Sequence, residues 1–239
     1  METMATIAPP LRTPVLPDPI RAVIFDMDGT LLETEAAQHR AFEATGAALG
    51  WPLSHEILDS MVGISRDLNQ VMLANRLGPD FPLAQFYADS DVLFEAAVDA
   101  GLPLRPGARL ILDHFRDTGV SLALCTSTQG GKAQARLAQA GLLDYFDVVV
   151  TRSDVTHAKP HPEPYLLAAK RLGVDPADCV AVEDSYAGVR SSVAAGIATV
   201  MVPDLLPATE EQTLVAAKVL PSLSDLRDLL LARTENSEL

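Results

Sequence analysis

The chain has 239 residues, of which 48% are hydrophobic and 21% charged, a composition typical of a globular protein that buries a core without disulfides. Acidic residues outnumber basic ones by 32 to 18, and the net charge of −14 argues against a nucleic-acid partner, because phosphate backbones attract basic surfaces. No apolar stretch is long enough to span a bilayer, the first residues lack a signal-peptide pattern, and both cysteines lie in apolar runs. We therefore expect a cytoplasmic protein with no membrane partner.

The first part of the chain predicts an arm, a strand and a helical insertion, in that order. Residues 1–19 hold five prolines and little periodicity, so we expect a flexible arm and a fold that starts near Ile20. The run AVIF that follows predicts a buried strand ending at DMDG. Residues 34–103 then predict a helical cap that returns to the core through GLPLRPG. Its expected helices lie at 36–49, 55–60, 66–77 and 83–100.

The rest of the chain alternates strand and helix patterns, which predicts a parallel sheet with helices on both faces. We expect an α/β fold in which 20–33 and 104–239 form a Rossmann-like core with a five-stranded sheet, and 34–103 the inserted cap. The four further strands are expected at 121–125, 147–150, 179–183 and 198–202, and the helices at 107–118, 130–140, 163–172, 186–195 and 223–232.

Polar residues stand at the carboxyl ends of the first two predicted strands, the edge where open parallel sheets place their ligands. Asp26 and Asp28 lie in DMDGT, and Thr126 and Ser127 follow SLALC. Each pair has a structural alternative, because Asp is an ordinary turn residue and Thr or Ser can cap the next helix.

Two later segments favour the functional interpretation of these residues over the structural one. Lys159 precedes a proline in a predicted loop, and Glu183 and Asp184 end the fourth predicted strand. Acidic groups gathered at one edge repel each other unless a divalent cation lies among them, and oxygen ligands without His or Cys favour Mg²⁺. A lysine and a hydroxyl beside such a cation indicate a site for a phosphoryl group.

With these residues in order, the sequence resembles the haloacid dehalogenase-like hydrolases across nearly all of 20–205. The four motifs of that family have counterparts in FDMDGT, CTS, KPHPEPY and VEDSYAGV, and the predicted cap resembles that of its phosphatase and β-phosphoglucomutase branch. Such caps close over the substrate and exclude water during phosphoryl transfer.

The resemblance implies a role for each motif residue. Asp26 would be the nucleophile that forms an aspartyl-phosphate, and Asp28 the general acid and base. Thr126 and Ser127 would contact the phosphoryl group, and Lys159 would neutralise its charge. The implied Mg²⁺ ligands are Asp26, Asp28 through its backbone carbonyl, Asp184 directly, and Glu183 as an alternate or outer ligand.

Three residues of the predicted cap are candidates for contacting the rest of the substrate. Arg66 follows a turn in GISR, and Glu35 and Gln38 come just after the first linker. The alternative for Arg66 is an exposed helix arginine. No sequence pattern identifies the substrate itself.

The resemblance implies a Mg²⁺-dependent phosphatase for a small phosphorylated metabolite such as a sugar phosphate. A sugar phosphomutase remains the alternative, although the branch's mutases carry a cap histidine twelve residues after the nucleophile, where Gln38 stands here, and a cap lysine, which is missing between Leu31 and Lys132. A binding module without activity is a third alternative, which the intact motifs oppose. No heptad or long apolar patch stands out, and we expect a monomer or weak homodimer.

Overall fold

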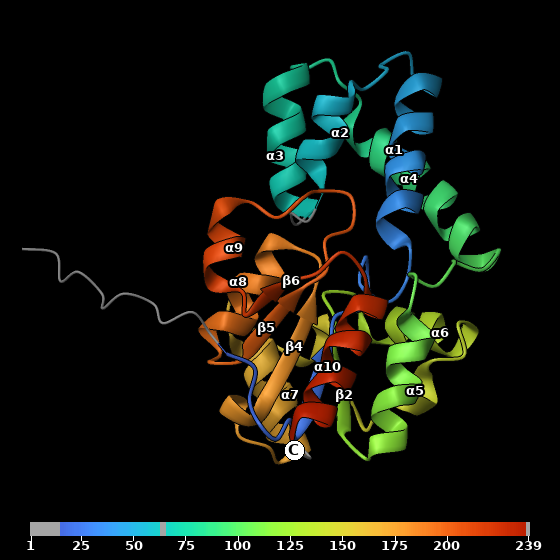
Figure 1. Ribbon diagram of the computed structural model, residues 1–239. Coiled ribbons are helices and arrows are strands. Elements are labelled where there is room, and N and C mark those ends of the chain that lie inside the picture. Colours follow the sequence, from blue (N-terminus) through green and yellow to red (C-terminus); the bar gives the residue numbers. More distant parts are fainter. Residues whose placement is uncertain (1–14, 63–65, 238–239) are drawn as a thin grey trace, which may run out of the picture.

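The computed structural model describes the backbone of residues 15–62 and 66–237, which form a layered core and a helical unit above it (Figure 1). The core sheet is parallel, and its strand order is β3-β2-β1-β4-β5-β6. Its strands are β1 (Ala22–Phe25), β2 (Ser121–Cys125), β3 (Val148–Val150), β4 (Cys179–Glu183), β5 (Ala198–Met201) and β6 (Lys218–Val219). This confirms the predicted α/β class, but the sheet has six strands and not five.

The missed strand, β6, explains why the predicted strand count was wrong. It contains only Lys218 and Val219, and both are exposed. A two-residue strand without buried side chains leaves no alternation in the sequence. It pairs with β5, where Val200 lies opposite Lys218.

Helices cover both faces of the sheet, because alternate residues of each strand point to opposite faces. Val23 and Phe25 of β1 pack with α5 (Ala108–Thr118), α6 (Gly130–Gln139) and α10 (Leu223–Ser237), whereas Ala22 and Ile24 pack with α7 (Glu163–Leu172). Leu16 is buried in the first of these clusters, so the core begins upstream of the predicted start at Ile20, while residues 1–14 of the predicted arm lie outside the described residues. The other helices of the core are α8 (Tyr186–Ala194) and α9 (Glu210–Val215), and short 3₁₀ turns lie at Leu143–Tyr145, Arg152–Asp154 and Pro176–Asp178.

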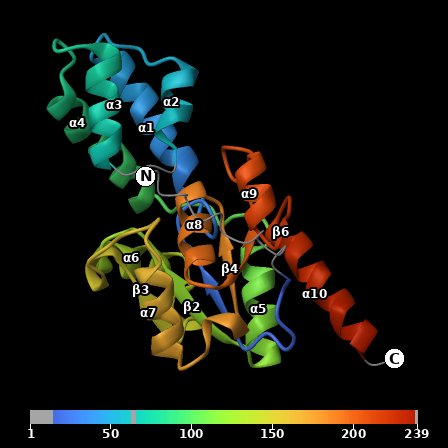
Figure 2. The same cartoon turned by 90° about the vertical axis from the view of Figure 1, so that its left-hand side faces the viewer.

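Within the described residues, four helices between β1 and α5 form the upper unit, called the cap below, which lies beyond the carboxyl ends of the strands (Figures 1 and 2). They are α1 (Thr34–Ala48), α2 (His55–Met61), α3 (Arg66–Leu77) and α4 (Leu83–Asp99). The cap has hydrophobic clusters of its own, in one of which the rings of Phe42 and Phe86 stack 5.5 Å apart. No helix within the described residues is long and apolar enough to cross a membrane.

Two linkers, lying side by side, join the cap to the core. Leu32 on the way out forms an antiparallel bridge with Leu104 on the way back, and the Glu33 amide donates to the Pro103 carbonyl at 3.0 Å. Arg105 Nη1 also contacts Asp204 Oδ1 at 2.6 Å. The return linker is therefore tied to the loop that follows β5.

Candidate active site

The sheet register brings the motif residues to one edge. Phe25, the last residue of β1, lies opposite Leu124 of β2 and Val182 of β4. The residues that follow these three strand positions must therefore emerge side by side at the carboxyl edge. The Asp26 amide donates to the Val182 carbonyl at 3.0 Å, which keeps Asp26 in line with the strand.

Lys159 lies at the centre of this edge, with its side chain 5% exposed. Its ammonium donates to Asp26 Oδ1 at 2.6 Å, to Glu183 Oε1 at 2.5 Å and to the Cys125 carbonyl at 2.8 Å. Burial alone would lower the pKa of Lys159, but the Asp26 and Glu183 carboxylates more than reverse this effect and hold the pKa well above its ordinary value. Lys159 therefore remains a cation.

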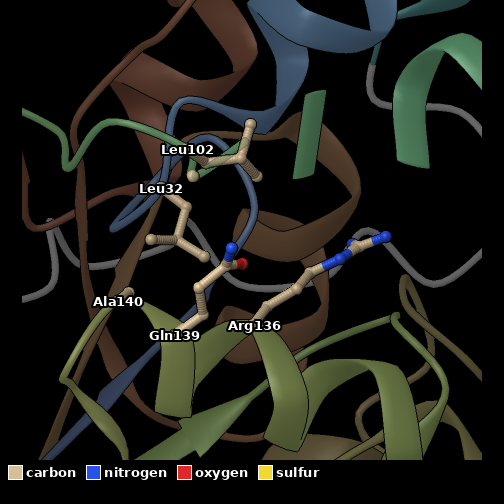
Figure 3. A pocket seen from close by; sticks show the side chains of 6 residues that line it. Leu32, Leu102, Arg136, Gln139 and Ala140 are labelled. Atoms are coloured by element: carbon tan, nitrogen blue, oxygen red, sulfur yellow. The ribbon is translucent and has the colours of Figure 1, made fainter. Parts of the chain in front are cut away.

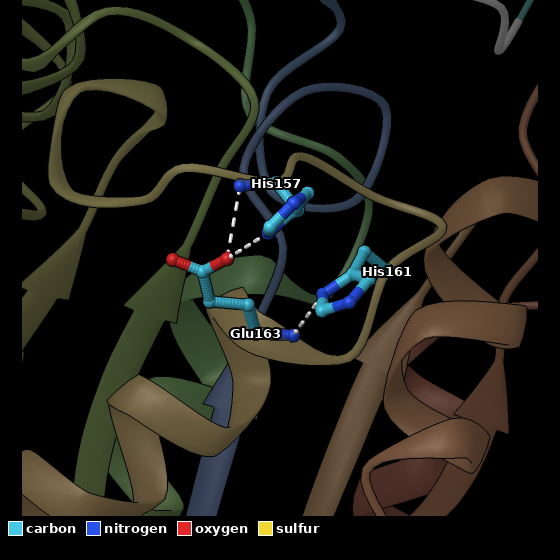
Figure 4. A group of neighbouring side chains, drawn as sticks. All are labelled: His157, His161 and Glu163. Atoms are coloured by element: carbon cyan, nitrogen blue, oxygen red, sulfur yellow. Dashed lines mark hydrogen bonds and ion pairs between the residues drawn. The ribbon is translucent and has the colours of Figure 1, made fainter.

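The loop that presents Lys159 is braced by Glu163, at the start of α7 (Figure 4). The Glu163 carboxylate accepts the amides of Thr156 and His157 at 2.8 and 2.9 Å and the His157 Nδ1 at 2.8 Å. These bonds, led by those from the two backbone amides, lower the pKa of Glu163 to about 2. His161 Nδ1 accepts the Glu163 amide at 3.2 Å. Both histidines thus shape the loop on either side of Lys159.

Glu183 is fully buried, and both of its carboxylate oxygens are engaged. Besides Lys159, Oε1 accepts the Tyr165 hydroxyl at 2.6 Å, and Oε2 accepts the Ser185 hydroxyl at 3.1 Å. A Cβ atom at Gly188 would lie 1.9 Å from the Glu183 carboxyl carbon, so only glycine leaves room for this carboxylate. These contacts fix the Glu183 carboxylate where it binds the Lys159 ammonium.

Asp184 adds a third carboxylate beside Asp26 and Glu183, and ligand atoms of the three residues lie within 4.8 Å of one another. Thr30 Oγ1 donates to Asp184 Oδ1 at 3.1 Å, and Gly29, at φ +81°, passes so close that a Cβ atom there would lie 2.2 Å from Oδ2. Burial and neighbouring carboxylates raise the pKa of Asp184 well above its ordinary value. Burial also raises the pKa of Asp26, which Lys159 only partly offsets.

This donor set fits a hard divalent cation. The oxygens converge in a buried place where the negative charge exceeds that of one ammonium group, and Mg²⁺ prefers carboxylate and carbonyl oxygens to nitrogen or sulfur. Because Glu183 is already engaged, the side chains of Asp26 and Asp184 have the oxygens best placed to bind such a cation.

Asp28 lies beside the carboxylate cluster but has a different set of partners. Its Oδ2 accepts the hydroxyls of Thr126 at 3.2 Å and of Thr128 at 2.6 Å, and its Oδ1 lies 3.3 Å from Nη1 of Arg136. The Thr128 amide also donates to Thr126 Oγ1 at 3.0 Å. The segment that follows β2 and helix α6 together fix the position of this carboxyl group.

Among the predicted cap residues, Glu35 lies close enough to the carboxylate cluster for its charge to act on Asp184. The Cγ atom of Glu35 would be 3.2 Å from a Cβ atom at Gly29. Burial, followed by the charges of Asp28 and Asp204, raises the pKa of Glu35 to about 7. Gln38 lies one turn further along α1, and its buried Nε2 has no hydrogen-bond partner among the described residues.

Glu35→Gln is expected to flatten the pH dependence of stability measured without a divalent cation. The folded protein holds the Glu35 proton more tightly than the unfolded chain does, so its contribution to stability is present below about pH 4.5 and lost as the pH rises through about 7. Above pH 7 the variant should be more stable than wild type by on the order of 2 kcal/mol in urea unfolding. Glu43→Gln, an exposed change on the same helix, is the control; equal pH profiles for Glu35→Gln and wild type would contradict the prediction.

Two predicted site residues do not contact this cluster in the structure. Arg66 Nη1 donates to Asp91 Oδ2 at 3.0 Å, and its guanidinium lies 4.7 Å from the centre of the Tyr87 ring, so its partners are within the cap. Ser127 is exposed. The predictions that these residues contact substrate stay predictions.

Sequence reasoning overlooked Arg136 and left the role of the segment 126–129, which contains Thr128, undecided between phosphate and the following helix. Arg136 carried a usable signal, because it stands beside Ala133 and Leu137 on the buried face of an amphipathic helix, where a charged residue needs a partner. Thr128 carried none, since a threonine just before a helix is an ordinary cap residue.

A cavity of about 130 Å³ opens beside Asp184, between the cap and the core. Val62, at the end of α2, contributes to it from the cap, and Asp204 from the loop after β5. The other lining residues are Ser185, Tyr186, Ala187, Arg190, Leu205 and Leu206. The edge that holds the carboxylate cluster therefore adjoins a space bounded by both units.

Comparison with known proteins gives the same family that the motifs suggest. The family model for hydrolases described as haloacid dehalogenase-like hydrolase matches residues 20–196. Phosphorylated carbohydrates phosphatase of Thermotoga maritima is 34% identical over 178 residues, which cover 74% of this chain and 82% of that protein. Hexitol phosphatase B of Escherichia coli K12 is 32% identical over 219 residues, 90% of this chain and 98% of that protein.

Solved structures agree with these relatives. CbbY of Rhodobacter sphaeroides in complex with phosphate has a TM-score of 0.72 and 31% identity, covering 87% of this chain and 96% of that one. A hydrolase of the same family from Deinococcus radiodurans R1, with bound phosphate and sodium, has a TM-score of 0.75 and 31% identity, covering 89% and 95%. The chain therefore belongs to the haloacid dehalogenase-like hydrolases, in their phosphatase branch, as its four motifs predict.

Proposed function

We propose that this phosphatase depends on Mg²⁺ and hydrolyses the phosphomonoester of a small metabolite, with a sugar phosphate as the preferred class. The observation that carries the proposal is the buried Asp26 carboxylate, which has the Lys159 ammonium 2.6 Å away and Asp184 beside it. A carboxylate so placed can attack a phosphoryl group whose charge the neighbouring cations neutralise. The names of the two phosphatase relatives support the sugar class.

The reaction would proceed in two steps on the residues of this chain. An Asp26 oxygen bonds to phosphorus as the ester P–O bond breaks, and Asp28 gives its proton to the leaving alkoxide. Asp28 then takes a proton from water, which attacks the aspartyl-phosphate, and phosphate leaves with Asp26 restored. Asp28 suits both steps because its carboxyl is fixed from two sides by hydroxyls and a guanidinium.

The side chains of Asp26 and Asp184 and the backbone carbonyl of Asp28 would hold Mg²⁺. The bound ion would neutralise developing charge on the phosphoryl group. We assign Glu183 to Lys159 rather than to the ion, because its Oε1 binds the Lys159 ammonium and the Tyr165 hydroxyl and its Oε2 is taken by Ser185. Lys159 would also contact a phosphoryl oxygen, as would the hydroxyls of Thr126 and Ser127.

The cap residues Glu35 and Gln38 are proposed to contact the sugar. Arg66 is proposed to bind a negative group at the end of the substrate remote from the phosphoryl group. The buried Gln38 amide has no partner among the described residues and suits a sugar hydroxyl. We favour hydrolysis over phosphoryl return because Gln38 replaces a histidine and residues 34–103 contain no lysine. Nothing obvious would therefore retain a bisphosphate for return transfer.

The test is phosphate release from a panel of hexose, pentose and hexitol phosphates, phosphoglycolate and nucleotides. We expect turnover of at least one sugar phosphate with Mg²⁺ and a loss of about 100-fold or more with chelator, since a bound cation supplies several kcal/mol. Restoring Mg²⁺ should restore the rate. Release that chelation leaves unchanged would refute the metal dependence. Conversion of β-glucose 1-phosphate to glucose 6-phosphate without phosphate release would establish the mutase instead.

A further inference from the structure

Arg136 is a buried cation that takes no direct part in the proposed proton and phosphoryl transfers. It extends from α6 of the core with its side chain 8% exposed, and it reaches the one carboxyl group that must move protons. Its Nη1 lies 3.3 Å from Asp28 Oδ1 and 3.4 Å from Thr128 Oγ1. Its Nε is buried and has no hydrogen-bond partner among the described residues. Protein groups therefore satisfy this guanidinium only in part.

The other side of Arg136 faces the cap. Its guanidinium carbon lies 5.0 Å from the centre of the Phe94 ring, and Nη2 lies 3.8 Å from Glu95 Oε1, both on α4. Lys132, one turn earlier on α6, pairs with the same Glu95. One turn later, Gln139 Nε2 donates to the Asp99 carbonyl at 3.1 Å. One face of α6 thus docks against α4 of the cap.

This docking face continues to the linkers. Arg136 and Gln139 rise together from α6, and Leu32 and Leu102, one from each linker, lie above them (Figure 3). These residues line a cavity of about 20 Å³, space for a single water. Arg136 therefore lies where α6, the cap and the hinge between cap and core meet.

We propose that Arg136 is a positioning residue for Asp28, and that Glu95 and Phe94 of the cap hold Arg136 in place. Docking of α4 on α6 would then fix the carboxyl group that protonates the leaving alcohol. The inference rests on the acid role proposed for Asp28. Its physical basis is that two hydroxyls fix only Oδ2, so Oδ1 owes its orientation to Arg136. A general acid must lie within hydrogen-bond reach of the atom it protonates.

The leaving group provides a test that stability alone would not affect. A sugar phosphate loses an alkoxide that needs a proton, whereas p-nitrophenyl phosphate loses a phenolate that does not. If Arg136 positions the acid, Arg136→Met should lower kcat/KM for the sugar phosphate about 10 to 100 times more than for the aryl phosphate. Arg136→Lys should recover part of the difference. Equal losses on both substrates would overturn the proposal and leave Arg136 a structural residue.

The cap's part is tested by Glu95→Gln, which keeps the shape of the side chain. It should produce the same substrate-dependent loss to a smaller degree, and Arg136→Met with Glu95→Gln should be no worse than Arg136→Met alone. Glu56→Gln, on the exposed side of the cap, is the matched control and should leave the ratio of the two substrates unchanged. Additive losses would overturn the cap's part.

The single Glu95→Gln variant keeps the test open if Arg136→Met fails to fold, because a loss equal on both substrates would then count against the proposal. Thermal unfolding of each variant identifies any folding defect. Failure of the proposed function looks different, since wild-type protein would then release phosphate from neither substrate.

Discussion

Asp26→Asn is expected to lower kcat for phosphate release by about 10,000-fold or more without loss of the fold. The amide is a poor nucleophile, so the covalent step has no substitute. Stability should be unchanged or slightly higher, because the change removes one of three crowded carboxylates while Lys159 keeps its bond to Glu183. The measurement combines phosphate release on the best substrate of the panel with thermal unfolding.

Asp28→Asn is the matched control, since it alters an acid two residues away and leaves the nucleophile intact. Losing a general acid should cost about 100- to 10,000-fold on a sugar phosphate and less on an aryl phosphate. Asp26→Asn should abolish turnover of both. An Asp26→Asn protein that still hydrolyses p-nitrophenyl phosphate at wild-type rates would mean that Asp26 is not the nucleophile.

Lys159→Met is expected to destabilise the protein by about 3 to 5 kcal/mol when no divalent cation is added. The change leaves the buried carboxylates of Asp26 and Glu183 without their ammonium partner, and an uncompensated buried charge costs about this much. For a chain of this size the melting temperature should fall by roughly 10 °C or more. Urea unfolding measures the free energy.

A second substitution tests this cause. Glu183→Gln in the Lys159→Met background should recover much of the lost stability, because it removes the buried charge that the first change leaves unpaired. Lys170→Met, on the exposed side of α7, should have little effect. A Lys159→Met protein as stable as wild type would show that the carboxylates do not depend on this lysine.

The site residues at the strand ends could be predicted because a short run of sequence indicates both a buried strand and the polar side chain that follows it. AVIF is a buried strand by composition, and the carboxyl group after it can emerge only at the strand's end. The same reasoning applied to Glu183 and Asp184, whereas Lys159 lies in a loop and its role followed from the resemblance of KPHPEPY to a family motif. In a parallel sheet, neighbouring strands end together, so residues far apart in the sequence were correctly expected at one edge.

Partner choice was not predictable, because it depends on distances that no spacing encodes. Glu183 and Asp184 are adjacent in the sequence and equally acidic, yet Glu183 contacts Lys159 and Tyr165, and Asp184 contacts Thr30. Arg136 likewise reaches Asp28 across 108 positions of sequence. The short strand β6 escaped notice because parallel pairing with β5, across the intervening helix α9, creates it and no side-chain pattern marks it.

The paired linkers also bear on how such a chain can change over generations. The two points at which the chain leaves the core and re-enters it are joined by the Leu32–Leu104 bridge and the hydrogen bond from the Glu33 amide to the Pro103 carbonyl. These contacts hold the two ends of the insertion side by side, whatever the length of chain between them. The entropy of closing a loop rises only slowly with its length. Insertions or deletions in the upper helices away from the face of α4 that contacts α6 are therefore tolerable to the sheet below, so much of the cap can change while the fold of the core is kept.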